Sequence, residues 1–400
     1  MKKITHYNRL VISVCLCSIA TFSNIYWLQA VLPQVQHSFG ISLLAVNLAM
    51  SASWFGMGIG LVIIACWSDA MGRTSVLINS MIVGLCLSLL LPMVENYSLF
   101  LVLRFLQGAF LAACPAIAIP LLGEELRKSW LPAAVGFYIA SNTIGGISSR
   151  LISGIGGELL ESWRSAGFII AIISSLLFCI VFVLLPKQRH FIKREFKIKQ
   201  SVKAFSLHLL SPELVILYAI SALAFGCFMN QFSYLMTVLK GAPYLLPGSV
   251  RSIMFITFLG GTCSASFAGK FSKKHGQIAG ITTGIFIMLG ANIMLSNQHL
   301  TLMMIGMIMM AAGFFFCHAQ ASTLVSRSVK KGKGSAMALY SLFYYSGGSL
   351  GVFYIDPFFQ NWGWQGVLGS TSMALILCLV LVSIYQVRSH QRQKISLHHA

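Results

Sequence analysis

Long apolar runs alternate with short polar connectors along the whole chain. The runs are rich in Leu, Ile, Met and Phe, and each is long enough for a transmembrane helix, which needs roughly 20 apolar residues. They lack the alternation of apolar and polar residues that marks outer-membrane strands. The pattern therefore predicts twelve transmembrane helices, at about 9–32, 43–67, 74–93, 97–122, 130–156, 163–186, 212–239, 249–271, 278–296, 299–326, 333–356 and 364–387.

The composition indicates that lipid is the main solvent of this chain. Hydrophobic residues make up 57% of it and charged residues 9%, and the mean hydropathy is +0.80. A soluble domain of 400 residues cannot bury that much apolar surface. We therefore expect an all-α, multi-pass protein of the bacterial inner (cytoplasmic) membrane.

The basic residues predict how the helices are oriented. The formal net charge is +19, and nearly all of the 28 Lys and Arg residues lie in connectors on one side of the predicted helices, which we call the basic side. Arg164, Lys240 and Arg251 lie on the other side, whereas Arg104 and Arg150 lie within helices. The positive-inside rule then makes the basic side, with both termini, cytoplasmic. The charge is a topology signal, and we expect no nucleic-acid partner.

Several other classes of function find no support in the sequence. The connectors are too short to hold a catalytic domain, and no phosphate-binding loop of an ATP-driven pump is present. The ten cysteines lie in or at the ends of apolar runs, without the spacing of metal ligands. We expect a monomer with neither enzymatic activity nor a metal or cofactor.

Two similar turns indicate an internal duplication. Asp69–Arg73 joins the second and third predicted helices, and Lys273–Gln277 joins the eighth and ninth, about half the chain further on. The longest connector is basic and separates six helices from six. We predict an N-terminal six-helix bundle at 1–186, a cytoplasmic linker at 187–211 and a C-terminal six-helix bundle at 212–400. Two parallel halves are typical of transporters.

The first of these turns also carries a motif. Asp69 can cap the following helix, Gly72 permits a sharp reversal, and Arg73 can reach a carbonyl group or a carboxylate of a neighbouring helix. These three residues match the signature loop of the major facilitator superfamily, G-x-L-x-D-R-x-G-R-[RK], which the segment resembles. The positions that depart from the pattern are Ala65, Trp67, Ala70 and Thr74. The resemblance implies a twelve-helix fold and a cytoplasmic latch that stabilises the outward-open state; an ordinary turn is the alternative.

A second motif lies in the fourth predicted helix. Residues 104–108 read Arg-Phe-Leu-Gln-Gly and resemble the R-F-x-Q-G motif of the same superfamily. An arginine within a transmembrane helix is costly and suggests a function, and the resemblance implies a link to proton transfer. The alternative is that Arg104 snorkels to the nearer membrane surface.

A third pattern is rich in small residues and lies in the fifth predicted helix. Residues 136–154 include Gly145, Gly146, Arg150 and Gly154, and small residues let helices approach closely. The glycine–arginine pattern resembles one branch of the superfamily, the acriflavine-sensitivity or arabinose-efflux-permease-like group. Residues 26–33 and 338–351 extend that likeness. The resemblance implies export.

Polar residues within the predicted helices are candidates for a central substrate cavity. Several share a helix face through three- or four-residue spacing. Hydrogen bonding between helices explains such residues equally well. The candidates are Tyr26, Gln29, Gln107, Asn142, Asn230, Gln231, Tyr234, Gln320, Tyr340 and Tyr344.

Carboxylates that could couple transport to protons are scarce. The chain has nine acidic residues, none at the centre of a predicted helix, and Asp356 lies near the end of the eleventh. His318 lies well within a helix and can titrate near neutral pH. The coupling candidates are Arg104, Arg150, His318 and Asp356, and facilitated diffusion is the alternative.

Together these features predict a secondary transporter that works by alternating access on a small-molecule substrate. We expect export of a small organic solute or drug, with proton antiport as one form of coupling. The intramembrane arginines favour an anionic or neutral substrate over a polycation. An importer of a small metabolite, by symport or facilitated diffusion, and a sensor that binds without transporting are the alternatives.

Overall fold

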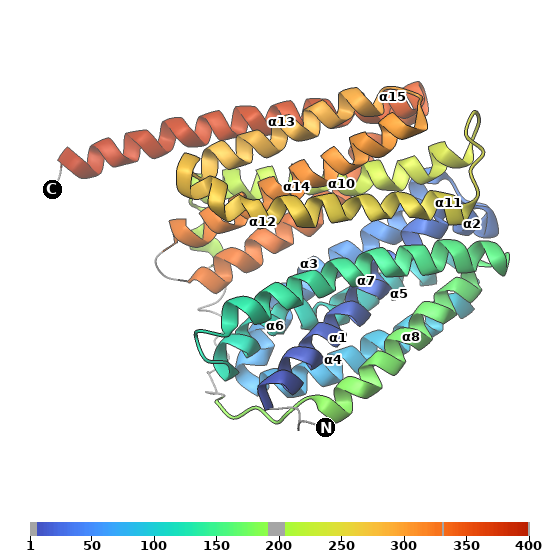
Figure 1. Cartoon of the computed structure of the whole chain (residues 1–400), viewed down its shortest axis with the longest axis horizontal. Coiled ribbons are helices and arrows are strands. Elements are labelled where there is room, and N and C mark those ends of the chain that lie inside the picture. The colour runs from blue at the N-terminus through green and yellow to red at the C-terminus, as the bar shows by residue number, and fades with distance from the viewer. Residues whose placement is uncertain (1–5, 191–204, 330–331, 399–400) are drawn as a thin grey trace. The chain divides into compact units, whose positions relative to one another are not determined.

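A computed structural model describes residues 6–190, 205–329 and 332–398, and every regular element in these ranges is a helix (Figure 1). The first half contains α1 (His6–Tyr26), α2 (Leu28–Phe39), α3 (Leu43–Met71), α4 (Arg73–Leu90), the 3₁₀ turn η1 (Leu91–Met93), α5 (Tyr97–Leu111), α6 (Ala113–Glu125), α7 (Leu131–Leu159) and α8 (Trp163–Leu184). The second half contains α10 (Pro212–Lys240), α11 (Gly248–Ile253), the 3₁₀ turn η2 (Met254–Thr257), α12 (Phe258–His275), α13 (Gln277–Leu295), α14 (Leu300–Ser328) and α15 (Lys333–His398).

The helices reproduce the predicted spans. Ten helical stretches of the described residues are long and apolar enough to cross a membrane. One of them, Lys333–Ser389, holds two spans, because the backbone of Gly363 is non-helical there (φ 56°, ψ −139°). A further span is α7, whose 29 residues include many glycines and serines that lower its hydropathy. The prediction of an all-α membrane protein with twelve transmembrane helices is confirmed.

Two spans that the sequence pattern treats as continuous are broken. The first is interrupted at Trp27, between α1 and α2, and the fourth at Ala112, between α5 and α6. Pro33 and Pro115 follow these breaks, and each lacks the backbone N–H that would bond the carbonyl group four residues earlier. Apolar periodicity does not register such breaks, because the residues around them stay apolar.

The described residues form two compact units. The first comprises Met1–Lys197 together with Met236–Ile256, and the second comprises Ile198–Leu235 together with Thr257–Ala400. The segment 236–256 belongs with the first unit because α11 packs against α7 and α2. Of the predicted linker at 187–211, residues 191–204 lie outside the described residues.

Glycines set the closest helix contacts of the first unit, in which α1 packs against α7 and α3 against α5. A Cβ atom at Gly56 would lie 2.0 Å from the carbonyl oxygen of Phe105, and one at Gly108 would lie 2.0 Å from that of Ser53. The two backbones therefore touch where only glycine fits. Gly108, the last residue of the Arg104 motif, thus has a packing role.

The second unit repeats this order of packing. Its second span, α12, packs against its fourth, α14. Its first span, α10, meets its fifth at Gly226 and Gly347, where a Cβ atom at Gly347 would lie 2.0 Å from the carbonyl oxygen of Ala222. Because both units pair their first span with their fifth and their second with their fourth, the packing supports the duplication inferred from the two turns.

We expect Gly56→Ala to destabilise the protein. The added methyl group must push α3 away from α5, at a cost of about 1–3 kcal/mol, and the melting temperature of the purified protein in detergent should fall by several degrees. Gly369→Ala is the matched control, since nothing lies within 4 Å of its Cβ position. Equal melting temperatures for the two variants would contradict the packing role of Gly56.

Candidate functional site

The predicted latch residues form an ionic cluster. The guanidinium group of Arg73 lies 2.8 Å from Asp69 Oδ1 and 2.7 Å from Oε1 of Glu124, at the end of α6. The same group lies 3.4 Å from the hydroxyl group of Ser68. Gly72 joins α3 to α4 at φ 98°, a conformation that favours glycine. We call Asp69, Arg73 and Glu124 the Arg73 cluster.

Glu124 was not among the predicted residues, yet it links the cluster to the start of the basic connector. Its Oε2 accepts a hydrogen bond from the side chain of Gln188 at 2.9 Å. Glu125 accepts hydrogen bonds from the backbone N–H groups of Arg189 and His190, at 2.8 and 2.9 Å. The available signal was the adjacent acidic pair at the basic end of the fourth span, in a chain with nine acidic residues.

The second turn has the same backbone but different chemistry. Gly276 joins α12 to α13 at φ 84° and so matches Gly72. Lys273 and Lys274 are exposed, and Gln277 stands where the first turn has Arg73. The two turns therefore differ in their side chains rather than in the course of the backbone.

Arg104 is completely buried and lies among backbone carbonyl groups. Its Nη1 and Nη2 atoms donate hydrogen bonds to the carbonyl oxygens of Asn24 and Ile25, both at 3.0 Å. Its other hydrogen bonds go to the carbonyl oxygen of Ala49, Oε1 of Gln107 and the hydroxyl group of Ser53. The guanidinium group does not reach a surface, as snorkelling would require, because the exposed fraction of the residue is 0%.

These contacts give Arg104 a structural task at the break in the first span. Carbonyl groups next to a break need donors from within the protein, since lipid offers none. Arg104 supplies donors to the two carbonyl groups before Tyr26, and Ser153 donates to the carbonyl oxygen of Trp27 at 2.7 Å. Gln107 extends the network to Ser88 at 2.7 Å. The arrangement holds a broken helix in place.

Arg150 occupies a different kind of site, between two aromatic rings. Its guanidinium carbon lies 4.2 Å from the ring centre of Tyr26 and 4.8 Å from that of Phe255. It donates hydrogen bonds to Gln29 Oε1 and to the carbonyl oxygen of Gly146, both at 2.9 Å. We call these five residues the Arg150 site. Two of them, Tyr26 and Gln29, were predicted cavity residues.

Two features of the Arg150 site could not be anticipated from periodicity. Phe255 comes from the distant segment 236–256. Gly146 leaves room for the arginine, since a Cβ atom there would lie 3.3 Å from Nη1 of Arg150 and 3.4 Å from the ring of Tyr26. A buried guanidinium group with an aromatic face on each side can bind a planar anion while its rings contact an apolar body.

A further contact closes the other end of α7. Oε2 of Glu158 accepts a hydrogen bond from the backbone N–H of Ser249 at 2.6 Å, at the start of α11. A Cβ atom at Gly154 would lie 2.5 Å from Cβ of Ser252. Gly154, the last glycine of the small-residue pattern, therefore lets α7 and α11 touch.

In the second unit, two predicted coupling residues pair with tyrosines. The hydroxyl group of Tyr340 lies 2.9 Å from Nδ1 of His318, whose ring centre is 4.9 Å from that of Tyr344. Tyr234 donates a hydrogen bond to Asp356 Oδ1 at 2.8 Å, and both side chains are buried. In each pair, His318 with Tyr340 and Asp356 with Tyr234, a titratable side chain lies within hydrogen-bond distance of a tyrosine hydroxyl group.

The remaining cavity candidates make hydrogen bonds within and between helices. Asn230 donates to the carbonyl oxygens of Gly226 and Gly348, and Gln320 to that of Ala268. Asn142 accepts a hydrogen bond from Ser18. Gln231 donates to Asn292 and Thr371, two residues that the sequence reasoning missed. These contacts are those expected of residues that hold helices together.

Comparison with known proteins identifies the family. A sequence profile of the Major Facilitator Superfamily matches residues 14–352. The chain belongs to this superfamily. Its function is therefore transmembrane transport, as the latch motif led us to expect.

Similar proteins span nearly the whole chain. The uncharacterized MFS-type transporter YybF of Bacillus subtilis is 31% identical over 92% of this chain and 91% of its own length. The inner membrane transport protein YnfM of Escherichia coli is 30% identical over 96% of this chain and 92% of its own. The solved structure of the nucleoside transporter NupG has a TM-score of 0.77 at 14% identity, over 96% of this chain and 99% of that one. That likeness concerns the fold alone.

We expect Arg104→Gln to lower stability. The shorter amide cannot reach both carbonyl groups at the break, and each buried carbonyl group left without a donor costs about 1–3 kcal/mol. The melting temperature in detergent should fall clearly, whereas Lys187→Gln, at an exposed basic residue, should leave it unchanged. A stable Arg104→Gln variant with lost transport would instead favour a direct role in proton transfer.

Proposed function

We propose that this transporter exports a small organic anion, or a neutral solute with an anion-like polar group, by alternating access. The Arg150 site carries the proposal. It holds a positive charge at 1% exposure, between Tyr26 and Phe255, in the second half of the membrane-spanning helix α7. Burying a charge in a membrane protein is costly and marks functional positions.

The chemistry of the Arg150 site favours this class of substrate. A guanidinium group binds carboxylates and similar anions through two parallel hydrogen bonds. The charge attracts an anion strongly at low dielectric and repels a polycation equally. Gln29 and Gly146 already orient the guanidinium group. Its side chain therefore loses little conformational entropy when a substrate binds.

For proton coupling we propose Asp356, with Tyr234 as its partner. A proton antiporter needs a group that changes its charge state during the cycle, and Asp356 is the one acidic residue within the last five spans. It accepts a hydrogen bond from Tyr234 at 2.8 Å, and both side chains are buried. His318 with Tyr340 is the second candidate pair. Arg150 would take part in coupling through its interaction with the charge of the substrate.

The Arg73 cluster is proposed to act as the latch. It lies on the basic side, which we take as cytoplasmic, with both termini there and the bacterial inner membrane as location. Its two acidic residues come from different spans, so the cluster ties the α3–α4 turn to α6. A contact made in one state and lost in the other shifts the balance between states by its own free energy.

Transport assays in everted membrane vesicles test the substrate and the direction. Vesicles that pump protons inward should accumulate labelled organic anions over size-matched organic cations. Arg150→Gln should reduce that uptake about tenfold or more, because it removes a buried charge that faces the substrate anion. Arg388→Gln, at an exposed arginine, is the matched control. Preference for polycations, or unchanged anion uptake by Arg150→Gln, would refute the proposed site.

The same vesicles distinguish the alternatives. Uptake that survives collapse of the pH gradient would remove proton antiport. Accumulation only in right-side-out vesicles would indicate an importer, and no exchange of any compound in a broad panel would favour a sensor.

The latch makes a separate prediction. Asp69→Ala should reach the membrane in nearly normal amounts and transport at least about fivefold more slowly, because losing a half-exposed pair worth about 1 kcal/mol shifts the balance between states. Glu124→Gln should act in the same direction, and Glu95→Gln, at an exposed acid outside the cluster, should transport normally. Normal transport by Asp69→Ala would reduce the segment to a helix-connecting turn.

A further inference from the structure

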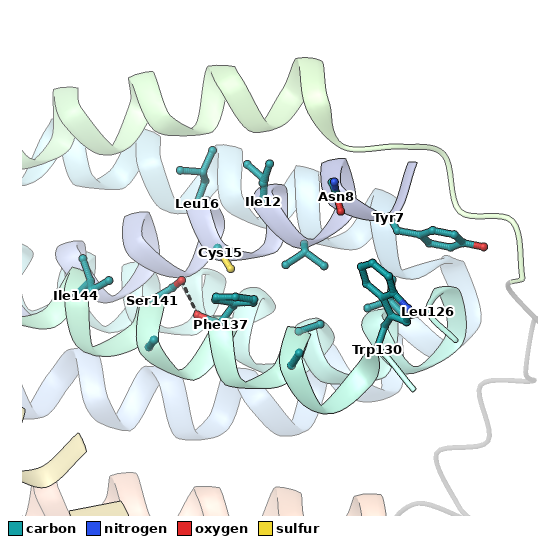
Figure 2. Close-up of a pocket in the computed structure, with 14 residues that line it drawn as sticks. Tyr7, Asn8, Ile12, Cys15, Leu16, Leu126, Trp130, Phe137, Ser141 and Ile144 are labelled. Carbon is teal, nitrogen blue, oxygen red and sulfur yellow. Dashed lines mark hydrogen bonds between the residues drawn. The ribbon is translucent and has the colours of Figure 1, made fainter. Parts of the chain in front are cut away.

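An open apolar groove runs between α1 and α7 in the first unit, with a volume of about 600 Å³ (Figure 2). Ile12 and Leu16 line it from α1, and Trp130, Phe137 and Ile144 line it from the start and first half of α7. Ser141 is one of the few polar side chains in it, and its hydroxyl group donates to the carbonyl oxygen of Phe137 at 2.8 Å. The groove therefore offers an apolar surface rather than hydrogen bonds.

The groove differs from the Arg150 site because its lining is apolar and exposed, whereas that site holds a buried charge. Phe137 is 63% exposed and Ile144 54% exposed. Large apolar side chains this exposed in a membrane-spanning helix meet lipid chains, which are as apolar as leucine. A hollow lined in this way is filled by a hydrocarbon chain, because a void would forfeit its packing contacts.

The groove is long enough to reach across one leaflet. Trp130, which directly precedes α7, and Ile144 on α7 lie toward its two ends (Figure 2), and at 1.5 Å per residue that stretch is about 21 Å long. Half of the hydrocarbon core of a bilayer is roughly 15 Å thick. A groove of this length, followed along a tilted helix, holds one acyl chain from the interface to the bilayer centre.

The mouth of the groove is cationic. Leu126 and Trp130 line the mouth, and the exposed residues Arg127 and Lys128 lie between them in the chain, on the basic side. The nearest acidic residues along the chain, Glu124 and Glu125, are engaged with other groups. Trp130 is 61% exposed, and tryptophan prefers the interface between hydrocarbon and headgroups.

We propose that this groove is a binding site for an anionic phospholipid of the leaflet on the basic side. One acyl chain lies between α1 and α7, and the headgroup phosphate binds Arg127 and Lys128. A basic pair at the membrane surface attracts anionic headgroups. The apolar groove retains the acyl chain of such a lipid, so that the lipid stays bound instead of exchanging freely with the bilayer. The site is independent of the substrate proposed above.

Fluorescence quenching of Trp130 by brominated lipids tests the site. The full-length protein is placed in nanodiscs of phosphatidylcholine with a minor fraction of phosphatidylglycerol. In one sample the phosphatidylcholine carries brominated acyl chains, and in the other the phosphatidylglycerol does. The difference between the wild type and Trp130→Phe isolates the Trp130 signal. Brominated phosphatidylglycerol should associate with Trp130 at least about threefold better than brominated phosphatidylcholine, as two cations near the surface require.

Two variants separate the headgroup from the chain. Arg127→Gln with Lys128→Gln should bring the preference close to one, whereas Lys273→Gln with Lys274→Gln, an equal charge change at another exposed pair, should preserve it. Ala140→Phe fills the groove and should also abolish the preference, with the cations intact. Ile139→Phe is its control, since Ile139 is 50% exposed and does not line the groove.

Three results would overturn the proposal. Equal quenching by both brominated lipids would mean that the groove meets bulk lipid only. Absence of quenching at Trp130 would mean that a solute or a protein segment fills the groove. A preference for phosphatidylglycerol that survives both Arg127→Gln with Lys128→Gln and Ala140→Phe would mean that the anionic lipid binds elsewhere.

Discussion

In a bilayer there is no solvent to bond a broken helix, and the first span of this transporter is broken at Trp27. The carbonyl group of Trp27 accepts from the backbone N–H of Ala30 at 3.4 Å, and any further donor to Trp27, Asn24 or Ile25 must lie inside the protein. Arg104 and Ser153 provide such donors. Since α1 also contributes Tyr26 and α2 contributes Gln29 to the Arg150 site, the geometry of that site depends on the break being held.

Close contacts between helix backbones make this arrangement possible. Gly108, four residues after Arg104, lets α5 touch α3. That approach brings the long arginine side chain within reach of Ala49 and Ser53 on α3 as well as the carbonyl groups of α1. The Arg104 motif thus combines a donor with the small residue that positions it. Packing accounts for their spacing of one helical turn.

The sequence predicted the fold far better than the site, for a physical reason. Apolar length depends on bilayer thickness and is visible in any single span, so all twelve spans could be read directly. The partners of Arg104 come from three helices and lie up to 80 positions away in the chain. Phe255 reaches the Arg150 site from the other half of the sequence. No local sequence pattern predicts contacts between residues so far apart in the chain. The breaks at Trp27 and Ala112 are also invisible in the sequence, because the residues around them stay apolar.

The chemistry of the two units differs more than their backbones do. The first unit holds the fully buried Arg104 and Arg150 within its spans, and the second holds His318 and Asp356, each beside a tyrosine. Similar packing in the two units thus surrounds different buried polar groups. In the proposed antiport, the anion at the Arg150 site and the proton at Asp356 interact with separate side chains. Exchange between them then requires the conformational change itself, because no single residue serves both ligands.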